Sequence, residues 1–309
     1  MDQLPPHVAP SLAPLAAAFV ATATEGSVTR AAEGLGIPQS TLSRRLKALE
    51  EHLGVALFLP EGRGLRLTAR GQEFLAGVRG PLRTLESAVA AARVDADADT
   101  GIVRFGFPLT LGPVSVPALL ADFHRRAPGV RLTLVQAHGE ALGRMLADGD
   151  LDVAIVIPMP TELPARSLGF QPVRLLVSRD HPLAGRERVE ISQLAGERFV
   201  ANPESYHLRG LLERWCRDAG FVPDVAFEIT EFETLRALVA RGLGIALLPP
   251  AEIPHPELVE IPLDGPLARR SIGLAIGPAG LTPAAQRLHD DLAAHAATGP
   301  SEPEPGSAQ

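Results

Sequence analysis

The sequence contains a single cysteine, Cys216, and lacks any long apolar run. One cysteine excludes an internal disulfide framework and suits a reducing, cytoplasmic compartment. Because Cys216 stands beside Trp215 on a predicted helix, we interpret it as a small packed side chain, with a reactive thiol as the alternative. No stretch approaches the roughly 18 apolar residues that a membrane span needs, and the N-terminus lacks the basic-then-apolar pattern of an export signal. We therefore expect a cytoplasmic protein with no membrane contact.

Motifs of catalysis and of cofactor binding are missing as well. The sequence has no GxSxG elbow, no GxxxxGK(S/T) phosphate loop and no dinucleotide fingerprint. Its nine histidines show neither HExxH nor a Cys–His spacing that would hold a metal. These absences argue against an enzyme, a bound cofactor and a metal site.

Charge is distributed unevenly along the 309 residues, whose net charge is −7. Residues 1–93 hold ten basic and eight acidic residues, a balance of +2. The remainder holds 19 basic and 28 acidic residues, a balance of −9. An acidic region repels DNA and should lie away from it, so any nucleic-acid contact is expected in the N-terminal part. The length itself favours two domains or more.

Residues 26–54 read as two short helices joined by a tight turn. The second, expected from Pro38 to Leu53, hides a stripe of leucines and shows a polar, basic face. Gln, Ser and Arg at the start of such a helix reach base edges and phosphates in a major groove. A solvated amphipathic helix is the alternative. The candidate DNA contacts on this helix are Gln39, Ser40, Thr41, Ser43, Arg44, Arg45 and Lys47.

Residues 55–68 alternate around Gly62-Arg63-Gly64, which predicts a two-stranded wing with a cation at its tip. A narrow minor groove attracts an arginine on a slim tip, so Arg63 is a further candidate DNA contact. An ordinary hairpin with a solvated arginine is the alternative.

From residue 69 to about 93, apolar residues recur at spacings of three or four, which is typical of a coiled-coil seam. A narrow seam needs a partner helix, so we expect this helix to pair two protomers, with a simple core helix as the alternative. Gly80-Pro81 should kink or interrupt it. The candidate dimerisation residues are Phe74, Val78, Leu82, Leu85 and Val89.

One set of residues forms a dense pattern over about sixty positions of the N-terminal region, namely Leu15, Phe19, Val20, Gly26, Ser27, Ala31, Ala32, Leu35, Ile37, Gln39, Ser43, Leu46, Leu49, Glu50, Leu53, Gly54, Leu57, Phe58, Leu67, Thr68 and Gly71. This pattern resembles the winged helix-turn-helix of LysR-type transcriptional regulators. Two departures stand out, because Leu59-Pro60 replaces a polar residue followed by Arg, and Arg70 replaces a small residue. The first departure would remove one phosphate contact near the wing.

Beyond the acidic stretch 94–100, short β runs alternate with amphipathic stretches, which indicates parallel sheets covered by helices. The expected strands are 102–107, 130–136, 151–157, 173–178, 225–230 and 244–249. The expected helices are 113–126, 139–148, 207–219, 232–241 and 282–297.

The family resemblance continues to about residue 297, notably at His181-Pro182-Leu183-Ala184 and at 242–246. It implies an effector domain shaped like a periplasmic solute-binding protein, with two α/β lobes and a cleft between them. The expected fold class is therefore α/β, with an N-terminal winged helix-turn-helix, a linker helix and this two-lobed domain. The expected boundaries are 1–68 for the DNA-binding domain, 69–93 for the linker, 101–297 for the effector domain (lobe one 101–162 with 268–297, lobe two 163–267) and 298–309 for a disordered tail.

Ligands in open α/β sheets sit beyond the carboxyl ends of strands, near helix N-termini whose amides favour anions. In the resembled family, the residue matched by Thr110 and the loop matched by 202–207 commonly line the effector site, although each could equally be a cap. His138, His207 and Arg209 indicate an anionic effector, such as a small carboxylate. The candidate effector contacts are Thr110, His138, Gly139, Asn202, Tyr206, His207, Thr230 and Phe232.

The resemblance implies a sequence-specific transcriptional regulator that binds double-stranded DNA and a small-molecule effector as a homo-oligomer, a dimer or a tetramer. RNA polymerase is a further expected partner. The alternatives are an α/β enzyme and a plain solute-binding protein, and a gel shift with random duplex DNA would separate both from a regulator.

Overall fold

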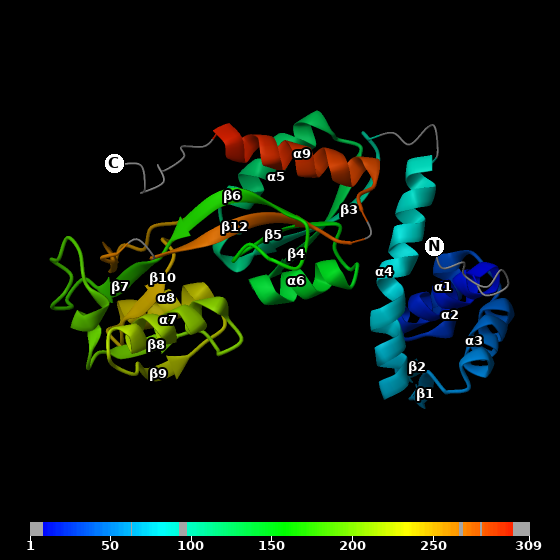
Figure 1. The fold of residues 1–309 in the computed structure, drawn as a ribbon, viewed down its shortest axis with the longest axis horizontal. Helices are drawn as coiled ribbons and strands as arrows, with labels where there is room; N and C mark the ends of the chain where they lie inside the picture. The colour runs from blue at the N-terminus through cyan, green and yellow to red at the C-terminus, as the bar shows by residue number, and fades with distance from the viewer. Residues whose placement is uncertain (1–8, 63, 93–97, 266–267, 279, 299–309) are drawn as a thin grey trace. The chain divides into compact units, whose positions relative to one another are not determined.

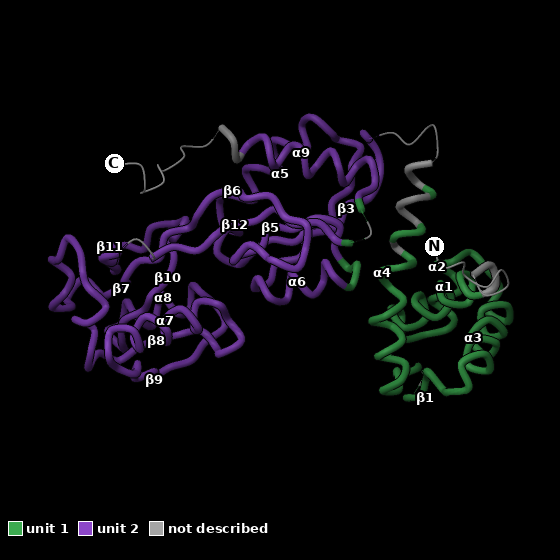
Figure 2. Tube along the Cα trace, in the orientation of Figure 1, with its two compact units in different colours: residues 1–94, 148–150, 278–280 green, residues 95–147, 151–277, 281–309 purple. Residues whose placement is uncertain are grey.

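The computed structural model of the protein describes residues 9–62, 64–92, 98–265, 268–278 and 280–298 (Figure 1). The chain forms two compact units, coloured separately in Figure 2. Unit 1 comprises residues 1–94, 148–150 and 278–280, and unit 2 comprises the rest. Arg63, most of the acidic stretch and residues 299–309 of the expected tail lie outside the described residues.

Unit 1 is a helix-turn-helix followed by a wing and a long helix. The Ser27 side chain caps the second helix by accepting from the Arg30 amide, and Gly36 and Gly54 end the second and third helices in the left-handed conformation. The third helix begins at Gln39, one residue later than expected, because Pro38 is its N-cap. The elements are α1 (Ala9–Glu25), α2 (Val28–Leu35), α3 (Gln39–Leu53), β1 (Phe58–Glu61), β2 (Gly64–Leu67) and α4 (Ala69–Ala92).

A single aromatic cluster joins the helices of unit 1 to its wing. The buried ring of Phe19 lies 5.2 Å from those of both Phe58 on β1 and Phe74 on α4. The Glu50 carboxylate on α3 accepts from the Leu57 and Phe58 amides, at 2.7 and 3.2 Å. These contacts fix the wing to the end of α3.

Helix α4 is continuous through Gly80-Pro81, so the expected interruption is absent, while the expected kink stays a prediction. Proline removes one backbone hydrogen bond of the helix, but the flanking turns continue the helix on both sides. The linker therefore forms as one 24-residue helix.

Unit 2 has two lobes, and we define lobe one by its five-stranded sheet. The strand order is β4-β3-β5-β12-β6, in which β3 is parallel to β4 and β5 while β12 is antiparallel to β5 and β6. Its elements are β3 (Gly101–Pro108), α5 (Ser115–Arg126), β4 (Val130–Ala137), α6 (Gly139–Ala147), β5 (Val153–Val156), β6 (Ala165–Pro172), β12 (Arg269–Ile276) and α9 (Pro283–Thr298).

Lobe two is built on an antiparallel sheet, β10-β7-β11, and a parallel pair, β8-β9. Leucines and valines from both sheets and from α7 and α8 share one core. Its elements are β7 (Arg174–Ser178), β8 (Arg198–Ala201), α7 (His207–Asp218), β9 (Asp224–Glu228), α8 (Phe232–Ala240), β10 (Ala246–Leu248) and β11 (Leu258–Pro262).

Two strands connect the lobes side by side (Figure 1). β6 leads directly into β7, and the Val173 amide donates to the Ala268 carbonyl just before β12 begins. Residues 165–172, expected in lobe two, pair with β12 in the sheet of lobe one.

All six expected strands and all five expected helices of unit 2 are present, but the expectation of parallel sheets is only partly right. The parallel order holds for β3, β4 and β5 and for β8-β9, whereas the β7 sheet is antiparallel. Strands β6, β8, β11 and β12 were not predicted. β6 has one buried residue and contains Arg166, Gly169 and Pro172, so it lacks the apolar run that marks a buried strand.

Candidate DNA interface and effector cleft

Helix α3 turns three of its four leucines inward and most of its polar residues to solvent, whereas Leu53 at its end, also expected to be hidden, is 37% exposed. Leu42, Leu46 and Leu49 are buried in the core of unit 1. On the other faces, Gln39, Ser40, Ser43, Arg44 and Lys47 are exposed, while Thr41 and Arg45 are half-buried. The structure thus brings the candidate DNA contacts together on the accessible side of one helix.

The cations of this face are held only weakly. Arg44 Nη2 lies 3.5 Å from Thr41 Oγ1, and Lys47 Nζ lies 3.6 Å from Glu51 Oε1. Exposed ion pairs contribute about 0–1 kcal/mol, so a phosphate can replace Glu51 at little cost. The wing adds Arg66 on β2, an exposed side chain that sequence reasoning missed and that pairs with Glu61 at 3.1 Å.

The candidate dimerisation residues divide into two groups along α4. Phe74 and Val78 pack against the core of unit 1, as in the core-helix alternative. Leu82 is half-buried, whereas Leu85 and Val89 are 50% and 48% exposed. Among the described candidate residues, the exposed apolar side chains therefore lie in the last part of α4.

A small cavity of about 20 Å³ lies between the lobes of unit 2, where loops of both converge. Lobe one contributes the ends of β3 and β4, and lobe two contributes the starts of α7 and α8. Six of the eight candidate effector contacts line it, namely Thr110, His138, Gly139, Tyr206, His207 and Phe232.

Aromatic contacts close this cavity across the lobes. The His138 ring stacks on Tyr206 with centroids 4.7 Å apart, and Tyr206 lies 6.4 Å from the Phe232 ring. Gly139 is required beside them, since a Cβ there would come within 2.1 Å of the Ile157 carbonyl oxygen.

Asn202 and Thr230, the other two candidates, do not line the cavity. Asn202 is buried and its Nδ2 donates to the Ile229 carbonyl at 3.1 Å, which is a structural bond. Thr230 is exposed. Arg209, the cation named with the two histidines, pairs with Glu213 at 2.7 Å and Glu228 at 3.0 Å, so its charge is already neutralised.

Arg270, at the start of β12, is a cavity residue that sequence reasoning missed. It is 7% exposed, and its Nε and Nη2 donate to Gln171 Oε1 on β6, with Nε at 3.1 Å. Nη2 also donates to Thr110 Oγ1 at 3.2 Å. Burial lowers the pKa of Arg270 to about 9, so the side chain remains charged at neutral pH.

His207 is neutral in the folded protein. Burial first, and then the charges of Arg270 and Arg214, lower the pKa of His207 to about 4. Its Nδ1 and that of His138 are buried, and neither has a hydrogen-bond partner among the described residues. Both rings can therefore still bond to a ligand.

Two of the helix N-termini in unit 2 are occupied by the chain's own carboxylates. Glu252, in the segment after β10, accepts from the Val114 and Ser115 amides at 2.7 and 3.1 Å, and so connects lobe two to α5 of lobe one. Glu231 accepts from the Glu233 and Thr234 amides at the start of α8. The expected anion site at the start of α5 is thus already filled, whereas α7 begins without a side-chain cap.

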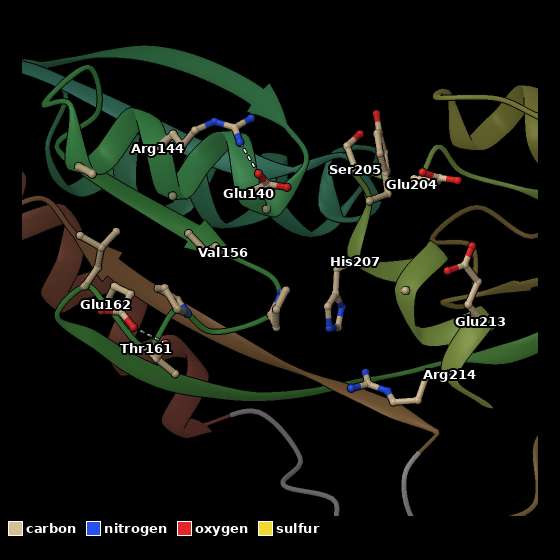
Figure 3. Close-up of a pocket in the computed structure, with 18 of the residues that line it drawn as sticks. Glu140, Arg144, Val156, Thr161, Glu162, Glu204, Ser205, His207, Glu213 and Arg214 are labelled. Atoms are coloured by element: carbon tan, nitrogen blue, oxygen red, sulfur yellow. Dashed lines mark hydrogen bonds and ion pairs between the residues drawn. The ribbon is translucent and has the colours of Figure 1, made fainter. Parts of the chain in front are cut away.

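A wider groove of about 930 Å³ adjoins the cavity and shares Gly139, Tyr206 and His207 with it. Figure 3 shows α6 on one side of the groove, with Arg144 paired to Glu140, and His207 and Arg214 on the side of α7. Apolar residues of lobe one, including Val156, Pro158 and Leu163, line its floor.

Family models match both units. The model described as a bacterial regulatory helix-turn-helix protein of the lysR family covers residues 15–72, and the LysR substrate binding domain covers residues 96–297. The chain belongs to the LysR family of transcriptional regulators. A winged helix-turn-helix with a two-lobed α/β domain is accordingly confirmed, and the plain solute-binding alternative is wrong because of the N-terminal match.

Relatives named as regulators support the same assignment. YybE of Bacillus subtilis, an HTH-type transcriptional regulator, is 34% identical over 272 residues, which cover 87% of this chain and 93% of YybE. The hydrogen peroxide-inducible genes activator of Dickeya chrysanthemi is 32% identical over 269 residues, covering 84% of this chain and 87% of that protein. These LysR relatives are regulators, so the regulator interpretation is confirmed over the enzyme alternative.

Solved structures agree on the fold. A full-length OxyR variant from Pseudomonas aeruginosa superposes with a TM-score of 0.75 at 25% identity, covering 91% of this LysR chain and 97% of OxyR. Among the residues that the structure describes, no helix is long and apolar enough to span a membrane.

Proposed function

We propose that this LysR-family chain reads a specific DNA sequence in the cytoplasm through α3 and the wing. Gln39, Ser40, Thr41 and Arg44 would contact base edges, and Ser43, Arg45 and Lys47 would hold or support phosphates. Arg63, outside the described residues, would enter the minor groove. The observation that carries the proposal is the exposed polar face of α3, whose opposite side is anchored by three buried leucines.

The test is to select DNA fragments with the purified full chain, sequence them, and measure affinity for the selected duplex. Arg44→Ala should cost about 1–3 kcal/mol on that duplex and relax the preference at one base pair. Arg70→Ala is the matched control, because Arg70 is an exposed, paired arginine of the same unit, on α4. An Arg44→Ala footprint and affinity equal to those of the wild type would contradict the base-contact role.

We also propose that two chains pair through the exposed end of α4, with tetramers formed as the family resemblance implies. Leu85 and Val89 are the available apolar residues. A dimer places two recognition helices on one symmetry axis and so lengthens the site that is read. Sedimentation of Leu85→Glu should show dissociation, and contact with RNA polymerase would follow at the bound promoter.

The second part of the proposal is control by a small molecule bound in the cleft of unit 2. Residues from both lobes line the cavity, so a ligand there would change the closure of the lobes and, through it, the spacing of the recognition helices.

Peroxide sensing, suggested by the name of the Dickeya relative, is less well supported. The only cysteine, Cys216, is buried in α7, and burial raises the pKa of its thiol to about 11. A protonated, buried thiol is a poor nucleophile. We therefore propose a bound effector, and we expect DNA affinity to be unchanged by peroxide in both the wild type and Cys216→Ser.

A further inference from the structure

Glu252 of lobe two completes the start of a helix that belongs to lobe one. Its two carboxylate oxygens accept from different backbone amides of α5, Oε2 from Val114 at 2.7 Å and Oε1 from Ser115 at 3.1 Å. The helix cannot cap itself, because Val114 stands at its N-cap and its first turn contains no Asp or Glu. A carboxylate on two helix amides forms charge-assisted hydrogen bonds at the positive end of the helix dipole. These bonds therefore join the lobes directly.

The backbone before this carboxylate is itself fixed to lobe two. We call residues 249–252, which follow β10, the strap. The Pro249 carbonyl accepts from Arg236 Nη2 on α8 at 2.8 Å. The Ala251 amide donates to Glu260 Oε1 on β11, also at 2.8 Å. Two elements of lobe two thus hold the strap in place.

The bonds to α5 are the weaker end of this series of contacts. Val114 and Ser115 are exposed, so water can replace the carboxylate at both amides. Arg236 is only 3% exposed, and loss of its bond to Pro249 would leave a buried cation without that acceptor, which costs more free energy. A movement between the lobes is therefore expected to break the contact at Glu252 and to leave the strap on lobe two.

Helix α8 connects the strap with the cavity between the lobes. Phe232, at the start of α8, lines the cavity, and its ring centroid lies 6.4 Å from that of Tyr206. Arg236 follows one turn later on the same face of the helix, and both side chains are buried. A displacement of Phe232 would therefore move the residue that anchors the strap.

We infer that Glu252 is a latch that holds the two lobes in the arrangement described above, and that α8 releases it when the residues of the cavity move. Release leaves the lobes joined by the connecting strands, about which they can rotate (Figure 1). The latch goes beyond the proposed function, because it is built from the chain's own residues within unit 2 and requires neither DNA nor a ligand.

The experiment measures the distance between the lobes in the full chain. Cys216→Ser removes the single native thiol, and Ala294→Cys on α9 of lobe one and Asp218→Cys on α7 of lobe two receive spin labels at exposed sites. Pulsed electron paramagnetic resonance gives the distribution of distances between the two labels. An excess of unlabelled chain suppresses distances between protomers. The labelled chain with an intact latch should show one dominant distance.

Substitutions of the latch itself should populate a second distance. Glu252→Ala removes both acceptor oxygens and should raise the second population about fivefold. Glu252→Gln keeps one acceptor oxygen but turns an amide NH₂ group towards the helix, so it should raise that population less. Glu257→Ala is the matched control, since it removes an exposed glutamate of the same segment, and it should keep the distribution of the intact latch.

Two further variants test the anchors of the strap. Arg236→Gln and Glu260→Ala leave Glu252 in place but loosen its backbone from lobe two. Each should raise the second population, and by less than Glu252→Ala does. The melting temperature of unit 2 is recorded for every variant, and the two anchors lie on different elements, so one variant still decides if the other is unstable.

The outcomes are distinguishable. A Glu252→Ala distribution equal to that of the intact latch would overturn the inference, as would an equal shift in Glu257→Ala or two comparable populations before any substitution of the latch. An unchanged distribution in both anchor variants would overturn the part of α8 in the release. Selected duplex DNA is titrated into the same samples, and a wild type that binds no duplex would overturn the proposed function while leaving the latch standing.

Discussion

The two candidate recognition sites present their arginines in opposite ways. Arg44 on α3 is exposed and, among the described residues, hydrogen-bonds to Thr41 alone, whereas Arg270 is 7% exposed and is held by residues of two other segments. An exposed cation keeps its hydration and therefore has a small desolvation cost. It suits a long polyanion, which contacts many such groups at once. A buried cation has a large desolvation cost and suits one small ligand that displaces solvent from it. The proposed DNA contact and the buried arginine of the cleft thus differ in how the chain holds the cation.

The largest expected effect would test whether the two sites are independent. Phe19→Ala removes a fully buried ring that contacts Phe58 and Phe74, and should destabilise unit 1 by about 3–5 kcal/mol. Chemical denaturation followed by DNA titration checks this, and Leu59→Ala, at a 41% exposed site on the wing, should change stability by less than about 1 kcal/mol. Melting of unit 2 at a lower temperature in Phe19→Ala than in the wild type would break the comparison.

A smaller effect should appear in the cleft at acidic pH. The pKa of His207 is about 4 in the folded chain, below its ordinary value of 6.5, so between these values the unfolded state binds the extra proton. The stabilisation is therefore complete above pH 6.5 and is lost as the pH falls towards 4.

The expected loss is about 1–2 kcal/mol, after allowance for the partial exposure of the ring. Thermal unfolding from pH 7.5 to 4 measures it, and His207→Gln should flatten this part of the profile. His52→Gln, at an exposed position of α3, serves as the control. A His207→Gln profile as steep as that of the wild type would show that the cleft does not hold this ring neutral.

The smallest effect concerns the carboxylate that joins the lobes. Glu252→Ala frees the Val114 and Ser115 amides and should cost about 1 kcal/mol in the stability of unit 2. Glu257→Ala, an exposed neighbour, is the control. Differential scanning calorimetry of both variants measures the change in stability. A melting temperature of Glu252→Ala equal to that of Glu257→Ala would mean that the bonds from Glu252 to the two amides are not formed in solution.

Sequence reasoning predicted the exposed face of α3 more completely than the lining of the cleft, for a physical reason. The face of α3 follows from the spacing of Leu42, Leu46 and Leu49 within one helix, so local periodicity places Gln39 and Arg44 outside. The cleft instead depends on segments far apart in the chain. Thr110 and Tyr206 were named because they stand at strand ends and helix starts, which are local signals as well.

The residues that were missed or misplaced depend on tertiary pairing. Arg270 could not be placed because β6 lacks a continuous apolar run and Arg270 stands at the polar start of β12, ahead of the apolar residues 272–276, and neither strand was predicted. Glu252 blocks the start of α5 from 137 or more residues away, which no local pattern reveals. Phe74 and Val78 share the spacing of the α4 seam, but only their contacts with the core of unit 1 distinguish packing from pairing.

The register of the connecting strands carries a mechanical consequence. Arg270 and Gln171 are directly opposite each other on β12 and β6, the two strands that lead from one lobe to the other. A rotation of one lobe against the other would twist β6 and β12 at this pair. A ligand bound by the Arg270 guanidinium would therefore act directly on the hinge between the lobes. Ligand binding and lobe rotation would then involve the same pair of side chains, without intermediate residues between them.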